Sequence, residues 1–144
     1  MKLEELARRA VACPKWRWMP GMLVKGNRVV SVSGFNPPYD YATPYAYVSY
    51  MGGPVYLLEL DRTIPDLQDP ATLGCLLALV RGAWGDQRAY LCDYGGYDSV
   101  EWGVVSHEWD AKRQATGPKA WFACLLGDSG TEAGALVAAL EAAP

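Results

Sequence analysis

The sequence predicts an α+β fold, in which an antiparallel sheet built from hairpins carries about three helices, N-terminal, central and C-terminal. Two observations favour this class. Glycine-centred turns join short apolar runs, which is typical of hairpins, and the helical segments do not alternate with single strands as they do in parallel α/β folds. The chain has 144 residues, enough for a core of its own, so we expect a single domain over residues 1–144.

The N-terminal helix is predicted over residues 3–12, where apolar residues recur at helical spacing and a proline follows. Glu4 precedes Arg8 by four residues on the polar side, and Glu5 precedes Arg9 in the same way. This is the favourable order for ion pairs along a helix. We therefore expect both pairs to form.

The next part of the chain predicts two hairpins. Lys25-Gly26-Asn27 and Gly52-Gly53 supply the turns, because glycine adopts positive φ without strain. The expected strands are 22–24, 28–33, 45–50 and 54–60.

The central helix is expected from Pro70 to about Arg81, with Asp69 as its N-cap and Gly82 and Gly85 at its end. Because almost no polar face remains along this segment, we expect it to be the most buried helix.

The last third of the chain predicts strands at 88–94, 97–106 and 119–126 and a final helix. Ser129 and Glu132 have the spacing of a capping box, which predicts that Ser129 begins this helix. Its inward residues are expected to be Ala133, Leu136, Val137 and Leu140. The simplest arrangement is one layer of sheet with the helices on one face.

The composition excludes some functions. A formal net charge of −3 argues against long nucleic acid as a partner, because such proteins carry a broad basic surface. No apolar run has the length of a membrane span, and the charged N-terminus lacks the core of a signal peptide. The widely spaced cysteines predict reduced thiols, a cytoplasmic location and no metal site. They are Cys13, Cys75, Cys92 and Cys124.

Three blocks of the chain resemble a group of small, uncharacterised proteins encoded by bacteriophages and prophages. The blocks are residues 16–22 (WRWMPGM), 65–81 (PDLQDPATLGCLLALVR) and 135–144 (ALVAALEAAP). The resemblance implies a phage protein that acts inside a bacterial cell. It implies no reaction and no catalytic residues.

Residues suited to catalysis are few. His107 is the only histidine, and no cysteine has a nucleophile motif around it. Asp93, Asp98 and Glu101 could hold a metal ion in a hydrolase, but aspartate beside glycine is also typical of a hairpin turn, which is the better interpretation. Glycine-rich nucleotide motifs are absent. The sequence therefore favours a protein that is not an enzyme and has no cofactor.

The segment from Cys13 to Met22 combines cations and aromatic rings between two prolines. Since prolines disfavour a helix, we expect an extended ribbon with the rings of Trp16 and Trp18 on one side and the cations on the other. The rings then either join the core or bind a ligand.

A small anionic, nucleotide-like ligand fits such residues, because bases stack on aromatic rings and arginine binds phosphate with two hydrogen bonds. The candidate ligand-binding residues are Lys15, Trp16, Arg17, Trp18, Arg28, Tyr39, Tyr41 and Arg62.

Two functions follow from these observations. The first is a phage counter-defence protein that sequesters a nucleotide-derived signal of the host. The alternative is a protein-interaction module that inhibits a host protein through the tyrosine-rich loop 34–50, whose tyrosines could instead fold back on the domain. A metal-dependent hydrolase is a more distant alternative. Hairpin edges also make a homo-oligomer compatible with the sequence.

Overall fold

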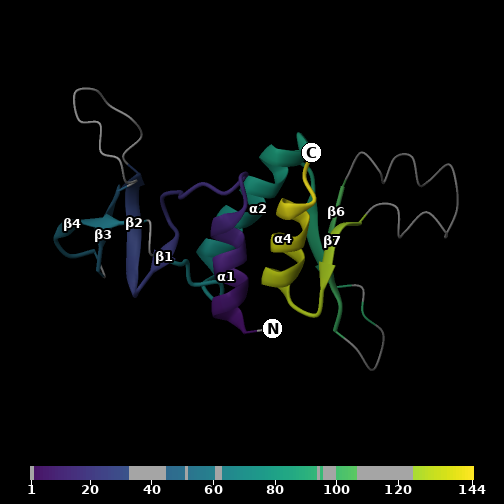
Figure 1. The fold of residues 1–144 in the computed structure, drawn as a ribbon, viewed down its shortest axis with the longest axis horizontal. Helices are drawn as coiled ribbons and strands as arrows, with labels where there is room; N and C mark the ends of the chain where they lie inside the picture. Colours follow the sequence, from purple (N-terminus) through teal and green to yellow (C-terminus); the bar gives the residue numbers. More distant parts are fainter. Residues whose placement is uncertain are drawn as a thin grey trace, which may run out of the picture. The chain divides into compact units, whose positions relative to one another are not determined.

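The computed structural model spans the whole chain, and the structure describes residues 2–32, 45–50, 52–60, 63–93, 95, 100–106 and 125–144. Within these residues it contains three helices and two antiparallel sheets, which confirms the α+β class (Figure 1). The expectation of one sheet is wrong, because the described strands before the central helix form one sheet and those after it form another.

The chain forms two compact units. We call residues 17–75 the central unit, and residues 1–16 with 76–144 the terminal unit. The expectation of one domain over residues 1–144 stays a prediction.

The four-stranded sheet of the central unit is a meander in the order β1-β2-β3-β4, with each pair antiparallel. The turn between the first two strands is tight, because Lys25 and Gly26 both have positive φ, at 48° and 77°. Both predicted hairpins are thus confirmed. The strands are β1 (Leu23–Val24), β2 (Asn27–Val32), β3 (Tyr45–Ser49) and β4 (Val55–Glu59).

One side of this sheet enters the core of the central unit. Val29 pairs with Val48, and both are buried, as is Ala46. A β-bulge interrupts the pairing of β2 with β3 between Val29 and Ser31, whereas β3 and β4 pair without interruption. A bulge places two residues of one strand opposite one of the other, which leaves Val30 exposed.

The central helix, α2 (Pro70–Trp84), begins where the sequence predicts but ends three residues later. Gly82 lies inside the helix, and Gly85, with φ of 65°, follows its last residue. Helices often end where a glycine adopts the left-handed conformation. Of Gly82 and Gly85, only Gly85 adopts this conformation, so the helix continues past Gly82.

The terminal unit is built around α4 (Glu132–Glu141), which packs on β6 and β7 and on α1. Seven of its ten residues are buried, including the four predicted to face inward, so α4 is more buried than α2. Its N-cap is Thr131, which accepts a hydrogen bond from the Gly134 backbone nitrogen, rather than the predicted Ser129, the last residue of β7. The other elements are α1 (Leu3–Ala12), β5 (Tyr90–Asp93), β6 (Trp102–Val105) and β7 (Leu125–Ser129).

Ion pairs on α1 follow the sequence prediction only in part. Arg8 pairs with Glu4 at 2.7 Å as expected. The guanidinium of Arg9 instead donates to both carboxylate oxygens of Glu141 on α4, at 3.1 and 2.5 Å. A bidentate pair between two helices has fixed geometry, which explains its preference over the expected partner Glu5.

Gly127 of β7 permits the close approach of α4 to the sheet. A Cβ at this position would lie 2.7 Å from the carbonyl oxygen of Ala135 and would meet the backbone nitrogen of Ala139. Only a glycine therefore fits between β7 and α4.

Replacing Gly127 with alanine is expected to destabilise the protein by about 1–3 kcal/mol, because α4 or β7 must move to admit the methyl group. Gly82→Ala is the matched control, since a Cβ there meets nothing within 4 Å, and it should stabilise α2 by about 0.5–1 kcal/mol. Urea unfolding measures both. Equal stability of wild type and Gly127→Ala would contradict the packing described.

Candidate functional site

The structure describes five of the eight predicted ligand-binding residues and divides them between the units. Lys15 and Trp16 belong to the terminal unit, and Arg17, Trp18 and Arg28 belong to the central unit. The other three, Tyr39, Tyr41 and Arg62, lie outside the described residues.

Residues 16–19 lie outside helices and strands, and the exposure of Arg17 between two less exposed tryptophans fits an extended ribbon. Trp16 is 8% exposed and contributes to the core, whereas Trp18 is half-buried and Arg17 is exposed. The amine of Lys15 donates a hydrogen bond to the carbonyl oxygen of Pro144. Of the two predicted roles for the tryptophans, Trp16 therefore has the core role.

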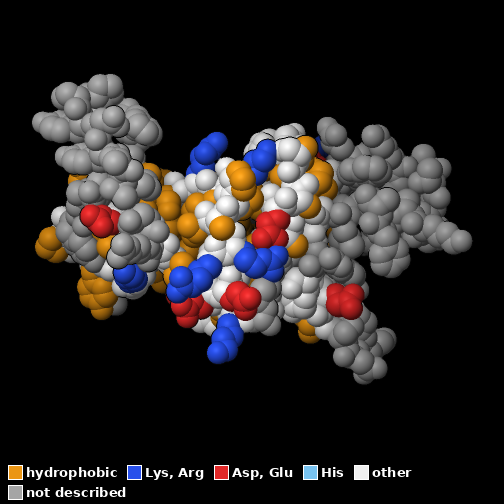
Figure 2. Space-filling model, viewed as in Figure 1, with side chains coloured by type: hydrophobic (Ala, Val, Ile, Leu, Met, Phe, Trp, Pro, Cys, Tyr) orange, Lys and Arg blue, Asp and Glu red, His pale blue; other side chains and the backbone are white. Residues whose placement is uncertain are grey.

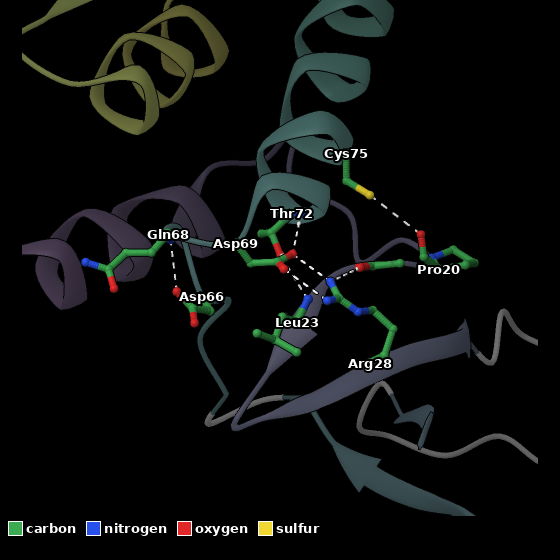
Figure 3. Close-up of polar contacts among 9 residues, drawn as sticks. Pro20, Leu23, Arg28, Asp66, Gln68, Asp69, Thr72 and Cys75 are labelled. Atoms are coloured by element: carbon green, nitrogen blue, oxygen red, sulfur yellow. Dashed lines mark hydrogen bonds and ion pairs between the residues drawn. The ribbon is translucent and has the colours of Figure 1, made fainter. Parts of the chain in front are cut away.

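Arg28 is bound on one side by Asp69 of the central unit. Its two terminal nitrogens donate to the two carboxylate oxygens of Asp69 at 2.6 and 3.0 Å, and one of them also donates to the carbonyl oxygen of Gly21 at 2.8 Å (Figure 3). Much of the fork that could clamp a phosphate is thus occupied within the protein. The sequence offers no local signal for this pair, whose members lie 41 residues apart.

Asp69 also begins α2, as the sequence predicts. Its carboxylate accepts hydrogen bonds from the backbone nitrogen of Thr72 at 2.7 Å and from the hydroxyl of Thr72 at 2.9 Å. The buried hydroxyl oxygen of Thr72 in turn accepts from the backbone nitrogen of Leu23, at 2.8 Å, in β1. We call Leu23, Arg28, Asp69 and Thr72 the Asp69 network (Figure 3).

The Asp69 network changes the acidity of its members. The hydrogen bonds from Arg28 and, to a smaller extent, those from Thr72 together lower the pKa of Asp69 from 3.8 to about 2, against the opposing effect of burial. The same pairing raises the pKa of Arg28. Burial, followed by the charge of Asp69, raises the pKa of the Cys75 thiol, which donates to the carbonyl oxygen of Pro20 at 3.5 Å. Such a thiol is a poor nucleophile.

A second feature of the central unit is an apolar surface on the sheet. Tyr47 and Val55 share one face, because Val55 lies opposite Ser49, two residues along β3 from Tyr47. Val30 lies next to Ser31, the partner of Tyr47. We call the four side chains the apolar patch: Val30, Tyr47, Tyr50 and Val55 are 49%, 45%, 59% and 53% exposed. Figure 2 shows hydrophobic side chains over this part of the sheet.

The candidate metal ligands are only partly described. Asp98 and His107 lie outside the described residues. Asp93 accepts a hydrogen bond from the backbone nitrogen of Gly95 at 2.9 Å, which is the geometry of an Asx turn. In the part of the chain that the structure describes, no group of three or more His, Cys, Asp or Glu could hold a metal ion.

Comparison of the chain with protein-family models, curated proteins and solved structures finds no match. The resemblance to phage-encoded proteins therefore stays a prediction. None of the helices that the structure describes has the length and apolar character needed to cross a bilayer.

The lowered pKa of Asp69 predicts how stability depends on pH. A carboxyl group whose pKa falls on folding contributes stability above its unfolded pKa and loses it as pH drops through the folded value. The drop from 3.8 to about 2 corresponds to about 2.5 kcal/mol at most, less where the half-exposed Arg28 is screened by solvent. Urea unfolding should therefore show this loss between about pH 4 and pH 2.

The control is Asp69→Asn, which keeps the shape of the cap and removes the charge. This variant should be less stable than wild type near neutral pH and should lose less stability on acidification. If wild type and variant lose equal stability over that range, the Arg28–Asp69 pair does not contribute as the geometry indicates.

Proposed function

We propose that this chain is a non-catalytic binding protein whose four-stranded sheet contacts a protein partner through the apolar patch. The observation that carries this proposal is the exposure of four apolar side chains, each about half exposed. Tyr47 and Val55 share one face of the sheet, Val30 lies at the bulge of β2, and Tyr50 follows the last residue of β3. Contiguous exposed apolar side chains on a folded protein mark interaction surfaces, and tyrosine is enriched at the centres of such surfaces.

The partner we expect is a bacterial host protein, met in the cytoplasm and inhibited by the contact. This setting rests on the resemblance of residues 16–22, 65–81 and 135–144 to phage-encoded proteins. Tyr47 and Tyr50 belong to the tyrosine-rich stretch 34–50 that the sequence analysis singled out, and both are exposed. Residues 34–44 of that stretch lie outside the described residues.

Placing a charge in the apolar patch is expected to prevent binding of the protein partner. Tyr47→Asp should lower the amount of the specific protein captured from bacterial lysate by tenfold or more, because a buried unpaired carboxylate at an interface costs about 2 kcal/mol or more. Quantitative mass spectrometry of the captured proteins makes the measurement.

The control is Leu3→Asp, which puts the same charge on a comparably exposed apolar residue of α1, 39% exposed in wild type. Thermal unfolding checks that both variants stay folded. A partner that binds wild type, Leu3→Asp and Tyr47→Asp equally would show that the patch is not the binding surface.

A second candidate function is sequestration of a small anionic, nucleotide-derived signal, as in counter-defence. Arg17 is exposed, and this accessible cation of the central unit supports the proposal, because a phosphate needs donors that the protein does not already use. The engagement of Arg28 by Asp69 leaves Arg17 as the stronger candidate for contact with phosphate.

Calorimetry with cyclic nucleotides and ADP-ribose derivatives tests this second candidate. We expect heat of binding at micromolar concentration for one member of the panel and a loss of affinity of about tenfold or more in Arg17→Ala, because a charge-assisted hydrogen bond contributes about 1.5–3 kcal/mol. Arg8→Ala, which removes an exposed arginine on α1, is the control. Absence of heat across the whole panel would end this proposal.

A further inference from the structure

β4 forms the outer edge of the four-stranded sheet. It is the last strand in the order β1-β2-β3-β4, and within the described residues its only strand partner is β3. The two strands pair over five consecutive residues, from Val55 opposite Ser49 to Glu59 opposite Tyr45, without a bulge. The opposite edge, β1, has only two residues. β4 is thus the longer and more regular edge of this sheet.

The sequence of β4 lacks the features that usually block pairing at an edge. Natural edge strands carry lysine, proline or a bulge, which prevent another strand from adding. Residues 55–59 contain neither lysine nor proline, and the bulge of this sheet lies between β2 and β3. Glu59 is the only charged residue of the strand. The backbone groups along this edge therefore suit an added strand.

We propose that a second copy of this chain adds at this edge, so that β4 pairs antiparallel with β4 of the second copy. Two neighbouring antiparallel strands that are related by a two-fold axis have that axis perpendicular to the sheet. A residue of one copy and the residue opposite it in the other copy must then point to the same face of the sheet. Because faces alternate along a strand, only every second register satisfies this condition.

The longest register that satisfies it is centred on Leu57 and uses all five residues of β4. Val55 of each copy then lies opposite Glu59 of the other, on the exposed face of the sheet. The apolar patches of the two copies become neighbours across the joint.

The charges of β4 are compatible with this arrangement. The two Glu59 residues lie at opposite ends of the joint, four residues apart along the strand, which is roughly 13 Å. Their repulsion is screened at physiological salt, where the Debye length is about 8 Å. The joint contains no facing pair of like charges, so a second copy fits the edge as it stands. Five residue pairs form a small interface, and we expect a dimer that dissociates on dilution.

The register makes opposite predictions for two substitutions at one exposed position. Val55→Glu places a carboxylate opposite Glu59 of the second copy at both ends of the joint, and should weaken the dimer. Val55→Lys places an ammonium there instead, and should preserve or strengthen it. Since cross-strand pairs contribute about 0.2–1 kcal/mol each and two pairs change sign, the dissociation constants of the variants should differ by about fourfold or more.

Sedimentation velocity over a wide range of protein concentrations measures the dissociation constants. Val30→Glu, at a comparably exposed position on β2 away from the edge, is the control and should dimerise like wild type. A wild-type protein that stays monomeric at every concentration overturns the proposal. So do variants at Val55 that shift the dissociation constant in the same direction, or a control that dissociates as Val55→Glu does.

This inference does not rest on the proposed function. The measurement uses the purified chain alone, whereas capture of a partner is read in lysate. A monomeric protein that still captures its partner would contradict only the dimer. A dimer that captures no partner would contradict only the proposed function.

Discussion

The carboxylate of Asp69 is the point on which the central unit depends. It binds the guanidinium of Arg28 in β2, and it caps the first turn of α2 through the backbone nitrogen of Thr72. Thr72 extends the connection to the backbone of Leu23 in β1. One side chain therefore holds the start of a helix to the first hairpin of a sheet. Its side chain is only 9% exposed, so few water molecules can replace these hydrogen bonds if one partner is lost.

This network also limits what the central unit can do. A cation that binds phosphate must keep its donors available, and two nitrogens of Arg28 already donate to Asp69. Placing a ligand there would leave the carboxylate of Asp69 close to an anion, which is electrostatically unfavourable. If the chain binds a nucleotide, Arg17 rather than Arg28 is thus the expected contact with phosphate. Binding of a protein partner through the apolar patch, in contrast, requires no residue of the Asp69 network. This difference is why we propose a protein partner ahead of a small anion.

The sequence predicts those features that depend on neighbours in the chain. Helix α1, the first two hairpins and the Asp69 cap all follow from spacing over a few residues, and all are found. Features set by distant contacts were missed. The pairing of Arg9 with Glu141 replaces a local partner, and the N-cap of α4 moves from Ser129 to Thr131 because β7 extends through Ser129. The division into two sheets has no local signal either.

The candidate site shows the same limit. The alternation of side chains along a strand predicts that Tyr47 and Val55 each share a face with the residues two positions away in the same strand. It does not predict which face of the sheet is exposed. That depends on which residues the core of the central unit buries, here Val29, Ala46 and Val48. The pairing of Arg28 with Asp69, over 41 residues, likewise needs the folded chain.

Strand propensity offers a competing explanation for the apolar patch, because valine and tyrosine favour strands even where they are exposed. This explanation covers Tyr47 and Val55, whose positions lie within regular pairing. It does not cover Tyr50, which follows the last residue of β3 and is 59% exposed. A polar residue there would cost the fold little, since exposed substitutions away from special features change stability by about 0.5 kcal/mol or less. Strand propensity therefore does not account for Tyr50, and the proposed contact with a partner is a role that this exposed ring could serve.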